Sequence, residues 1–254
     1  MSKHILEFVI TDFCNLNCPL CVQGMPLQTN KRIMPIDELR EISNFIKPFE
    51  FDAIKISGGE PTLHPQFAEI CKNLRKMFPA RYYILATNGF GLEKFKDYVY
   101  VFDKVSITHY PGRNDRVFER AKRLGLTNLK TGVKRDYIEM RDSYRERNLN
   151  KINVYKHCKK TRIKKIIQGR IYPCCVIFGQ AVRQNIDINT ISAPVDENWR
   201  ENLAKINIEN HCKRCSVDVK IPNFWKDVLN AFPRLRQNML HKACRDAKKH
   251  NRTI

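Results

Sequence analysis

The sequence TDFCNLNCPLC, Thr11 to Cys21, decides how the rest of the chain can fold. It places Cys14, Cys18 and Cys21 in a C-x3-C-x2-C array directly after an apolar run at residues 5–10. Three thiolates on one short loop can hold three corners of a cubane iron–sulfur cluster, because soft sulfur ligands suit iron. The fourth iron then stays open for another ligand. Taken alone, the motif leaves two alternatives, a structural zinc site and unrelated buried thiols.

Around this loop the apolar residues alternate between the spacing of strands and that of helices. The pattern predicts strands at 5–11, 52–56, 82–86, 104–108 and 128–133, and helices at 35–46, 65–77, 92–98 and 114–124. Such alternation predicts an α/β fold with a parallel sheet and chemistry at the C-terminal ends of its strands. Five or six units fit before residue 150, too few for a closed eight-unit barrel. We therefore expect a partial (β/α)6 TIM-like barrel over residues 1–150. A small cysteine-rich domain with a β-hairpin, a helix and a basic helical tail is expected over residues 151–254.

A second motif, ISGGEPTLHP, follows the second predicted strand. Gly58 and Gly59 permit backbone torsions and a close approach that a Cβ would block, Glu60 offers a carboxylate, and Pro61 stiffens the exit. Thr87-Asn88-Gly89 ends the third predicted strand in the same way. Because parallel strands end at one edge of a sheet, these segments are expected to lie near the cysteine loop.

This order of motifs resembles the radical SAM superfamily. The resemblance implies a [4Fe–4S] cluster on Cys14, Cys18 and Cys21, whose open iron is chelated by S-adenosylmethionine (SAM). Reductive cleavage of SAM then gives a 5′-deoxyadenosyl radical. The resemblance also implies contacts to SAM from Gly58, Gly59, Glu60, Pro61, Thr87 and Asn88. It implies a further contact from Leu20, at the position where the family commonly has an aromatic residue that packs against adenine.

A second set of cysteines lies in the C-terminal half, at Cys158, Cys174, Cys212 and Cys215. A hairpin of residues 164–167 and 170–172 around a Gln168-Gly169 turn would carry Cys174 back toward Cys158. Cys175 is the alternative to Cys174 as a ligand, and zinc is the alternative occupant, since four cysteines also satisfy zinc. The layout resembles the twitch domain, a shortened SPASM-type extension, which implies a second, auxiliary [4Fe–4S] cluster. Cys71 is expected in the core instead.

The chain carries a formal net charge of +20, and the segment 130–170 holds fourteen Lys and Arg against four Asp and Glu. This excess of positive charge favours binding to nucleic acid, to a phosphorylated substrate or to an acidic partner. A solvent-exposed helical face rich in lysine explains the excess equally well. Ten cysteines without a signal peptide indicate metal or redox chemistry in a reducing cytoplasm. No apolar run approaches the roughly 20 residues that cross a bilayer, so no membrane role is expected.

In architecture the sequence is most similar to the twitch-type dehydrogenases that oxidise the aminocyclitol 2-deoxy-scyllo-inosamine. We therefore expect a radical SAM oxidoreductase or epimerase acting on a small polar metabolite, such as a sugar, an aminocyclitol or a nucleotide, with a phosphorylated or anionic substrate left open. Its electron donor would be a protein such as flavodoxin or ferredoxin. His109 is the first candidate for a catalytic base and His64 the second. Two alternatives remain, a radical SAM enzyme that modifies peptides or proteins, and a nucleic-acid modifier or binder with zinc in its second site.

Overall fold

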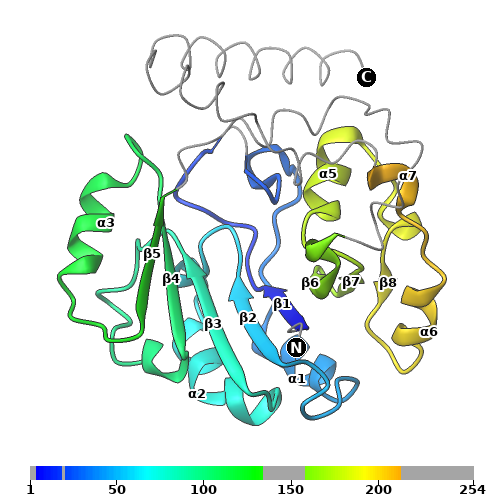
Figure 1. The fold of residues 1–254 in the computed structure, drawn as a ribbon, viewed down its shortest axis with the longest axis horizontal. Coiled ribbons are helices and arrows are strands. Elements are labelled where there is room, and N and C mark those ends of the chain that lie inside the picture. The colour runs from blue at the N-terminus through cyan, green and yellow to red at the C-terminus, as the bar shows by residue number, and fades with distance from the viewer. Residues whose placement is uncertain (1–3, 19–20, 134–157, 213–254) are drawn as a thin grey trace.

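The computed structural model describes residues 4–18, 21–133 and 158–212 (Figure 1). In this part of the chain, strands form a sheet in the order β5-β4-β3-β2-β1-β6-β7-β8. The strands are β1 (Ile5–Val9), β2 (Ala53–Ser57), β3 (Tyr82–Thr87), β4 (Lys104–His109), β5 (Leu129–Val133), β6 (Ile163–Ile167), β7 (Arg170–Tyr172) and β8 (Ala193–Pro194). The α-helices are α1 (Ile36–Ser43), α2 (Phe67–Met77), α3 (Asp115–Lys122), α5 (Ile177–Gln184), α6 (Trp199–Ala204) and α7 (Glu209–Cys212).

Strands β1 to β6 pair in parallel, and β7 and β8 continue the sheet in antiparallel pairing. The expected α/β fold with a partial barrel and an antiparallel C-terminal extension is thus confirmed. The sixth parallel strand is β6, the first strand of the predicted hairpin, and it pairs with β1. In the turn between β6 and β7, Gln168 and Gly169 have φ of 52° and 73°. Two positive φ angles are what a tight two-residue hairpin turn requires.

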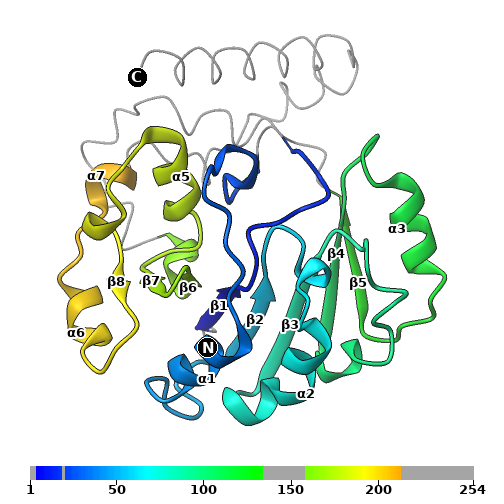
Figure 2. The same cartoon turned by 180° about the vertical axis from the view of Figure 1, so that it is seen from behind.

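The helices divide between the two ends of the sheet. Figures 1 and 2 show α1, α2 and α3 beside the strands β1 to β5, whereas α5, α6 and α7 gather near β6, β7 and β8. One predicted helix, at residues 92–98, is wrong, because these residues form a series of turns followed by a 3-10 helix at Val99–Val101. Leu92, Phe95 and Val99 are still buried as the pattern required. A seven-residue segment has too few hydrogen bonds to offset helix nucleation, so packing decides its shape.

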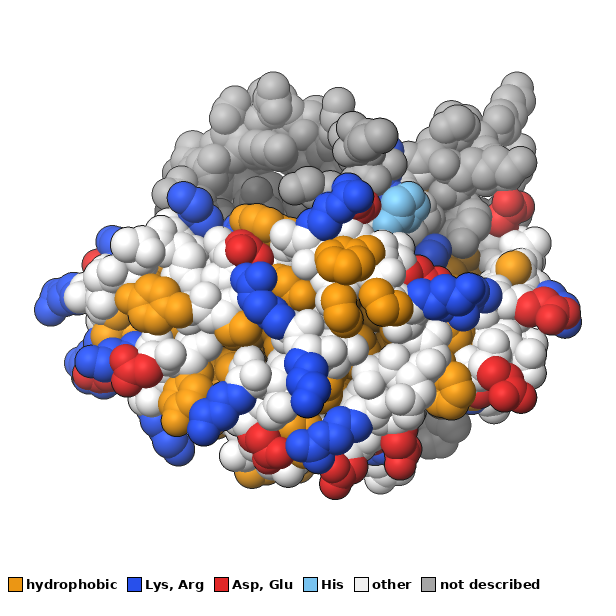
Figure 3. All heavy atoms as spheres, turned by 90° about the horizontal axis from the view of Figure 1, so that it is seen from below, with side chains coloured by type: hydrophobic (Ala, Val, Ile, Leu, Met, Phe, Trp, Pro, Cys, Tyr) orange, Lys and Arg blue, Asp and Glu red, His pale blue; other side chains and the backbone are white. Residues whose placement is uncertain are grey.

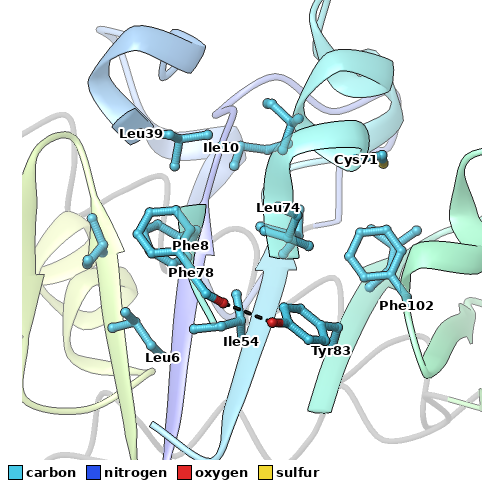
Figure 4. Packing of buried hydrophobic residues seen from close by; sticks show 14 of the residues in the cluster. Leu6, Phe8, Ile10, Leu39, Ile54, Cys71, Leu74, Phe78, Tyr83 and Phe102 are labelled. Carbon is cyan, nitrogen blue, oxygen red and sulfur yellow. Dashed lines mark hydrogen bonds between the residues drawn. The ribbon is translucent and has the colours of Figure 1, made fainter. Parts of the chain in front are cut away.

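The main core lies between the parallel strands and their helices (Figure 4). On β1, Leu6 and Phe8 point into this core and are fully buried, while Glu7 between them points to the opposite face. Residue alternation of this kind gives the sheet one apolar face and one face that can carry polar groups. Cys71 on α2 is 2% exposed within this core, which confirms the prediction for that cysteine.

Charged side chains of both signs cover the surface seen from below in Figure 3, where basic and acidic groups are interspersed. Among the described residues seen in this view, neither sign forms a patch of its own. Much of the basic segment 130–170, at residues 134–157, lies outside the described residues. Among the helices that the structure describes, none combines the length and the apolar character needed to cross a membrane.

Tyr83 on β3 connects the C-terminal end of α2 to the sheet by two hydrogen bonds. These hydrogen bonds lead to a prediction for stability. Its buried hydroxyl donates to Phe78 O at 3.0 Å and accepts from Ala80 N at 2.8 Å. Tyr83→Phe leaves both backbone groups without this partner, so the free energy of unfolding should fall by about 1–3 kcal/mol in urea titrations. Tyr100→Phe is the control, because Tyr100 is 55% exposed and its change should be close to neutral. Equal effects of the two variants would contradict this role of Tyr83.

Candidate active site

The cysteine loop lies directly against the glycine pair that follows β2. Gly59 N donates to Thr11 O at 2.7 Å, and Glu60 N donates to Phe13 O at 2.8 Å. A Cβ at Gly59 would lie 2.3 Å from Phe13 O, and one at Gly58 would lie 2.7 Å from Thr11 O. Neither glycine has a positive φ. The expected need for unusual torsions is therefore wrong at these positions, and the glycines instead provide space for the backbone of the cysteine loop.

Glu60 joins the ends of β2 and β3 from a fully buried position. Its Oε1 accepts hydrogen bonds from Thr62 N, Thr62 Oγ1 and Thr87 Oγ1 at 3.1, 2.7 and 2.6 Å, and its Oε2 accepts one from Asn88 N at 2.7 Å. Burial raises the pKa of this carboxyl, and the four hydrogen bonds oppose the rise. In this structure Glu60 holds Thr87 and Asn88 in place. Pro61 begins a short 3-10 helix at Pro61–Leu63. A direct contact to SAM stays a prediction for both Glu60 and Pro61.

Asn88 connects the end of β3 to the cysteine loop. Its Nδ2 donates to Asn15 Oδ1 at 2.9 Å and lies 3.8 Å from Cys14 Sγ. Its backbone carbonyl accepts from Asn114 Nδ2 at 2.8 Å, and the same Nδ2 donates to Thr108 O at 2.9 Å. Asn114 thus fixes the ends of β3 and β4 together from a buried position, a role that the sequence analysis missed. The available signal was its place at the start of the predicted helix 114–124, because an asparagine that begins a helix commonly bonds nearby backbone.

The three cysteines of the loop lie close enough together to affect one another. Burial raises the pKa of Cys14 to about 12, and the charges of Glu60, Cys21 and Cys18 add to this rise. Metal ligation requires thiolates, and the positive charge of a bound iron–sulfur core would favour the ionised form of Cys14. The donor set of three cysteines fits such a group. Among the described residues, no group of three His, Cys, Asp or Glu side chains is arranged around a single metal ion. A cubane instead takes each thiolate on a different iron. The expected adenine contact, Leu20, lies outside the described residues.

The C-terminal region packs onto the same loop. Gln168 in the β6–β7 turn donates through Nε2 to Asp12 Oδ2 at 2.8 Å, just before the cysteines. On α5, a Cβ at Gly179 would lie 1.9 Å from Val22 O, just after them. Both ends of the cysteine loop are therefore seated on elements from the second half of the chain.

Three predicted auxiliary ligands lie in the described part of the chain. Lys164 ties two of their loops together, because its Nζ donates to Thr161 O and to Pro173 O at 3.0 Å each. Thr161 follows Cys158, and its hydroxyl donates to Cys158 O at 2.7 Å, while Pro173 precedes Cys174. Cys174 and Cys212 pack against one apolar cluster, which Cys21 also contacts. That cluster comprises Val9, Met25, Ile167, Tyr172, Ile177, Phe178, Ala181, Ile191 and Ile208.

The neighbouring cysteines Cys174 and Cys175 have different surroundings. Cys175 is near the charges of Lys165, Glu7 and Lys160 rather than the apolar cluster, and burial raises the pKa of its thiol. Cys174 packs against the same apolar cluster as Cys212, which favours Cys174 over Cys175 as the ligand. Cys215, the fourth predicted ligand, lies outside the described residues.

His109, the first candidate base, ends β4 on the side that faces α3. Its ring stacks on Phe118 at 4.4 Å between centroids, and its Nε2 lies 2.6 Å from Asp115 Oδ1. Alternation along β4 places it with the buried Val105 and Ile107, on the face opposite Thr108. These contacts explain the position of the ring by packing, and a catalytic role stays a prediction.

His64, the second candidate, is buried and uses both ring nitrogens. Nε2 lies 2.8 Å from Met34 O and must carry the proton, while Nδ1 accepts from Gln66 N at 3.0 Å. This arrangement fixes a neutral imidazole between two backbone groups. The geometry favours a structural role over proton transfer.

The glycine contact gives a testable prediction for Gly59→Ala. Because the added Cβ would overlap Phe13 O, the cysteine loop must shift, and the iron bound by Cys14, Cys18 and Cys21 should be lost, about four irons per chain. Iron and sulfide analysis after anaerobic reconstitution measures this. Gly132→Ala is the matched control, because a Cβ there comes no closer than 4.0 Å to Ile107 O. Full iron content in Gly59→Ala would refute the proposed seating.

His64 gives a prediction for pH. Burial lowers its pKa below 6.5, so the unfolded chain binds more protons than the folded one as the pH falls below that value. The stability contribution is complete above pH 6.5 and is lost as the pH falls toward the folded pKa. In urea titrations from pH 7.5 to 5.5, the wild type should therefore lose stability more steeply than His64→Gln, which does not titrate. Parallel curves would contradict this assignment.

Comparison with known proteins agrees with the geometry. The family model described as "Radical SAM superfamily" matches residues 8–172. A crystal structure of BtrN in complex with AdoMet and 2-DOIA has a TM-score of 0.58 at 16% identity, covering 84% of this chain and 87% of that one. BtrN in an open conformation has a TM-score of 0.50 at 14% identity, with coverage of 84% and 85%. Streptococcus suis SuiB bound to precursor peptide SuiA has a TM-score of 0.45 at 12% identity, with coverage of 84% and 67%. The match across residues 8–172, together with the seated C-x3-C-x2-C loop, establishes that this chain belongs to the radical SAM superfamily.

Proposed function

We propose that this radical SAM enzyme oxidises or epimerises a small polar metabolite, with an auxiliary [4Fe–4S] cluster on Cys158, Cys174, Cys212 and Cys215. The observation that carries the proposal is the packing of Cys174 and Cys212 against the apolar cluster that also contacts Cys21. It supports two metal centres in adjoining parts of one fold. We keep the boundary of the auxiliary domain at residues 150 and 151 as part of this proposal.

The SAM site is proposed where the cysteine loop meets the ends of β2 and β3. Gly58 and Gly59 provide the space in which the cysteine loop lies, and Glu60 holds Thr87 and Asn88 at the adjoining strand end. When bound, the cluster and SAM supply the 5′-deoxyadenosyl radical that takes a hydrogen atom from the substrate. The chain itself positions SAM and keeps water from the reacting atoms.

A small substrate is supported by two observations. The sheet face opposite the main core carries polar groups, among them Ser57, Ser106 and Thr108, which a polar metabolite could contact. The BtrN complex, which shares this fold along most of both chains, holds AdoMet and 2-DOIA. We propose that the present chain likewise takes SAM and a small polar molecule.

Electron balance favours a second cluster if the reaction is a dehydrogenation. In such a reaction the deoxyadenosyl group would take one hydrogen atom, and the substrate would have to lose one further proton and one electron. A cluster with four cysteine ligands would accept that electron without binding the substrate. An external protein such as flavodoxin or ferredoxin would supply the electron that starts the cycle.

Metal analysis of the anaerobically reconstituted full chain tests the two-centre proposal. About eight irons and little zinc are expected in the wild type, and about four irons in the variant with alanine at Cys14, Cys18 and Cys21. Cys71→Ala is the control, because this buried core cysteine should leave the iron content unchanged. Four irons with one zinc in the wild type would remove the auxiliary cluster from the proposal.

Deoxyadenosine release under reducing conditions tests the reaction. The triple alanine variant should release none, and an aminocyclitol or a nucleotide sugar should accelerate release by the wild type. Acceleration by peptides alone would instead support a peptide-modifying enzyme. RNA binding that falls steeply with salt would support the nucleic-acid alternative.

A further inference from the structure

A row of three charged side chains crosses the sheet on the face opposite the main core. Glu7 on β1 pairs with Lys55 on β2 and with Lys165 on β6. Because residues paired across a ladder point to the same face, the carboxylate lies between two ammonium groups. Glu7 is 3% exposed and Lys165 is 2% exposed, so most of this row is removed from water.

The carboxylate in this row is held in its ionised form. Its Oε1 lies 3.1 Å from Lys55 Nζ and accepts from Ser57 Oγ at 2.6 Å. Burial raises the pKa of Glu7, but the charges of Lys165 and Lys55 and the hydrogen bond from Ser57 outweigh it, and the pKa falls to about 2. Glu7 therefore contributes a full negative charge at neutral pH.

The charges of the row do not balance. Two ammonium groups face one carboxylate, and Lys160 adds a further positive charge near the row, beside the thiol of Cys175. Lys165 is 2% exposed, and it shares the carboxylate of Glu7 with Lys55. A buried charge without a full partner is costly, so an anion from outside the chain would stabilise this arrangement.

The row lies near the SAM-binding end of the sheet. Ser57, which donates to Glu7, directly precedes the glycine pair that seats the cysteine loop. The Lys55 side chain is 24% exposed, so the row is reached by solvent on the β2 side. A molecule bound by its charged end at the row would extend toward the cysteine loop.

We propose that Lys55 and Lys165, with Glu7 between them, bind a carboxylate or phosphate group of the substrate. The inference rests on the proposed function, because it assigns the substrate of that site an anionic group. It makes Lys165 a determinant of specificity rather than a participant in the chemistry. Glu7 lies between the two lysine side chains and holds them on the same face of the sheet.

The first test measures anion binding on the reconstituted full chain without any substrate. At equal ionic strength, sodium phosphate or sodium acetate should raise the Tm of the wild type above its value in chloride by about 2–4 °C, the size of a modest ligand effect. The gain should vanish in Lys165→Met and persist in Lys165→Arg. Phosphate acting without acetate assigns a phosphorylated substrate, and acetate acting as well assigns a carboxylate.

Stability without added anion separates a binding site from a structural ion pair. If Lys165 belongs to an anion-binding site, Lys165→Met should unfold at the same temperature as the wild type or at a higher one, because the substitution removes a buried charge that is not fully compensated. Glu7→Gln should unfold at a lower temperature, because it leaves two ammonium groups facing each other. Lys122→Met, at an exposed position of α3, should change neither the Tm nor the anion effect. A lower Tm for Lys165→Met, with no anion effect in the wild type, would overturn the proposal.

Two further variants and one assay complete the test. Cys175→Ser should leave the anion effect unchanged, and an anion effect that appears only in this variant would show that the thiol, not an external anion, is the partner of the lysines. In the deoxyadenosine assay, Lys165→Met should lose the acceleration by an anionic substrate, and Lys165→Arg should keep it. Wild-type protein that binds anions but releases no deoxyadenosine would sink the proposed function alone. Release accelerated equally in the wild type and in Lys165→Met would sink the anion site alone.

Discussion

The absence of a side chain at residue 59 is the constraint on which the rest of this structure depends. The backbone of the cysteine loop occupies the space where a Cβ of Gly59 would stand, and two backbone hydrogen bonds hold it there. Once the loop is seated, Asn88 reaches Cys14, and Glu60 holds Asn88 in turn. These bonds lie in a buried, low-dielectric region, where hydrogen bonds reinforce one another and a missing partner is costly. One small residue thus sets the geometry of three strand ends.

The two cysteine-bearing halves of the chain form one structural unit. Gln168 contacts Asp12 before the first cysteine motif, and α5 packs against Val22 after it. The apolar cluster beneath Cys174 and Cys212 also includes Val9 of the first strand. A movement of the hairpin would therefore also displace the cysteine loop. This coupling fixes the positions of the two metal centres proposed above relative to each other without a separate linker.

Much of this arrangement was predictable because it depends on local patterns. The spacing of Cys14, Cys18 and Cys21, the glycine pair and the Gln168-Gly169 turn are local signals, and apolar periodicity placed most strands and helices. The turns at residues 92–98 escaped prediction because packing overrode a helical pattern in a short segment. The row of Lys55, Glu7 and Lys165 depends on which strands become neighbours, since its members lie far apart in the sequence. The hydrogen bond from Asn114 Nδ2 to Asn88 O could not be predicted for the same reason.

The place of β6 beside β1 has a consequence for how the protein is made. As the chain leaves the ribosome, β1 to β5 can pair in order, but one edge of β1 stays bare until residues 163–167 have been synthesised, about two thirds of the way along the chain. A bare strand edge is a template for unwanted pairing between nascent chains. Contacts between such distant residues also form slowly. Metal loading before this late strand docks would proceed on an unfinished loop, so the timing of cluster delivery should matter for the yield of active protein in cells.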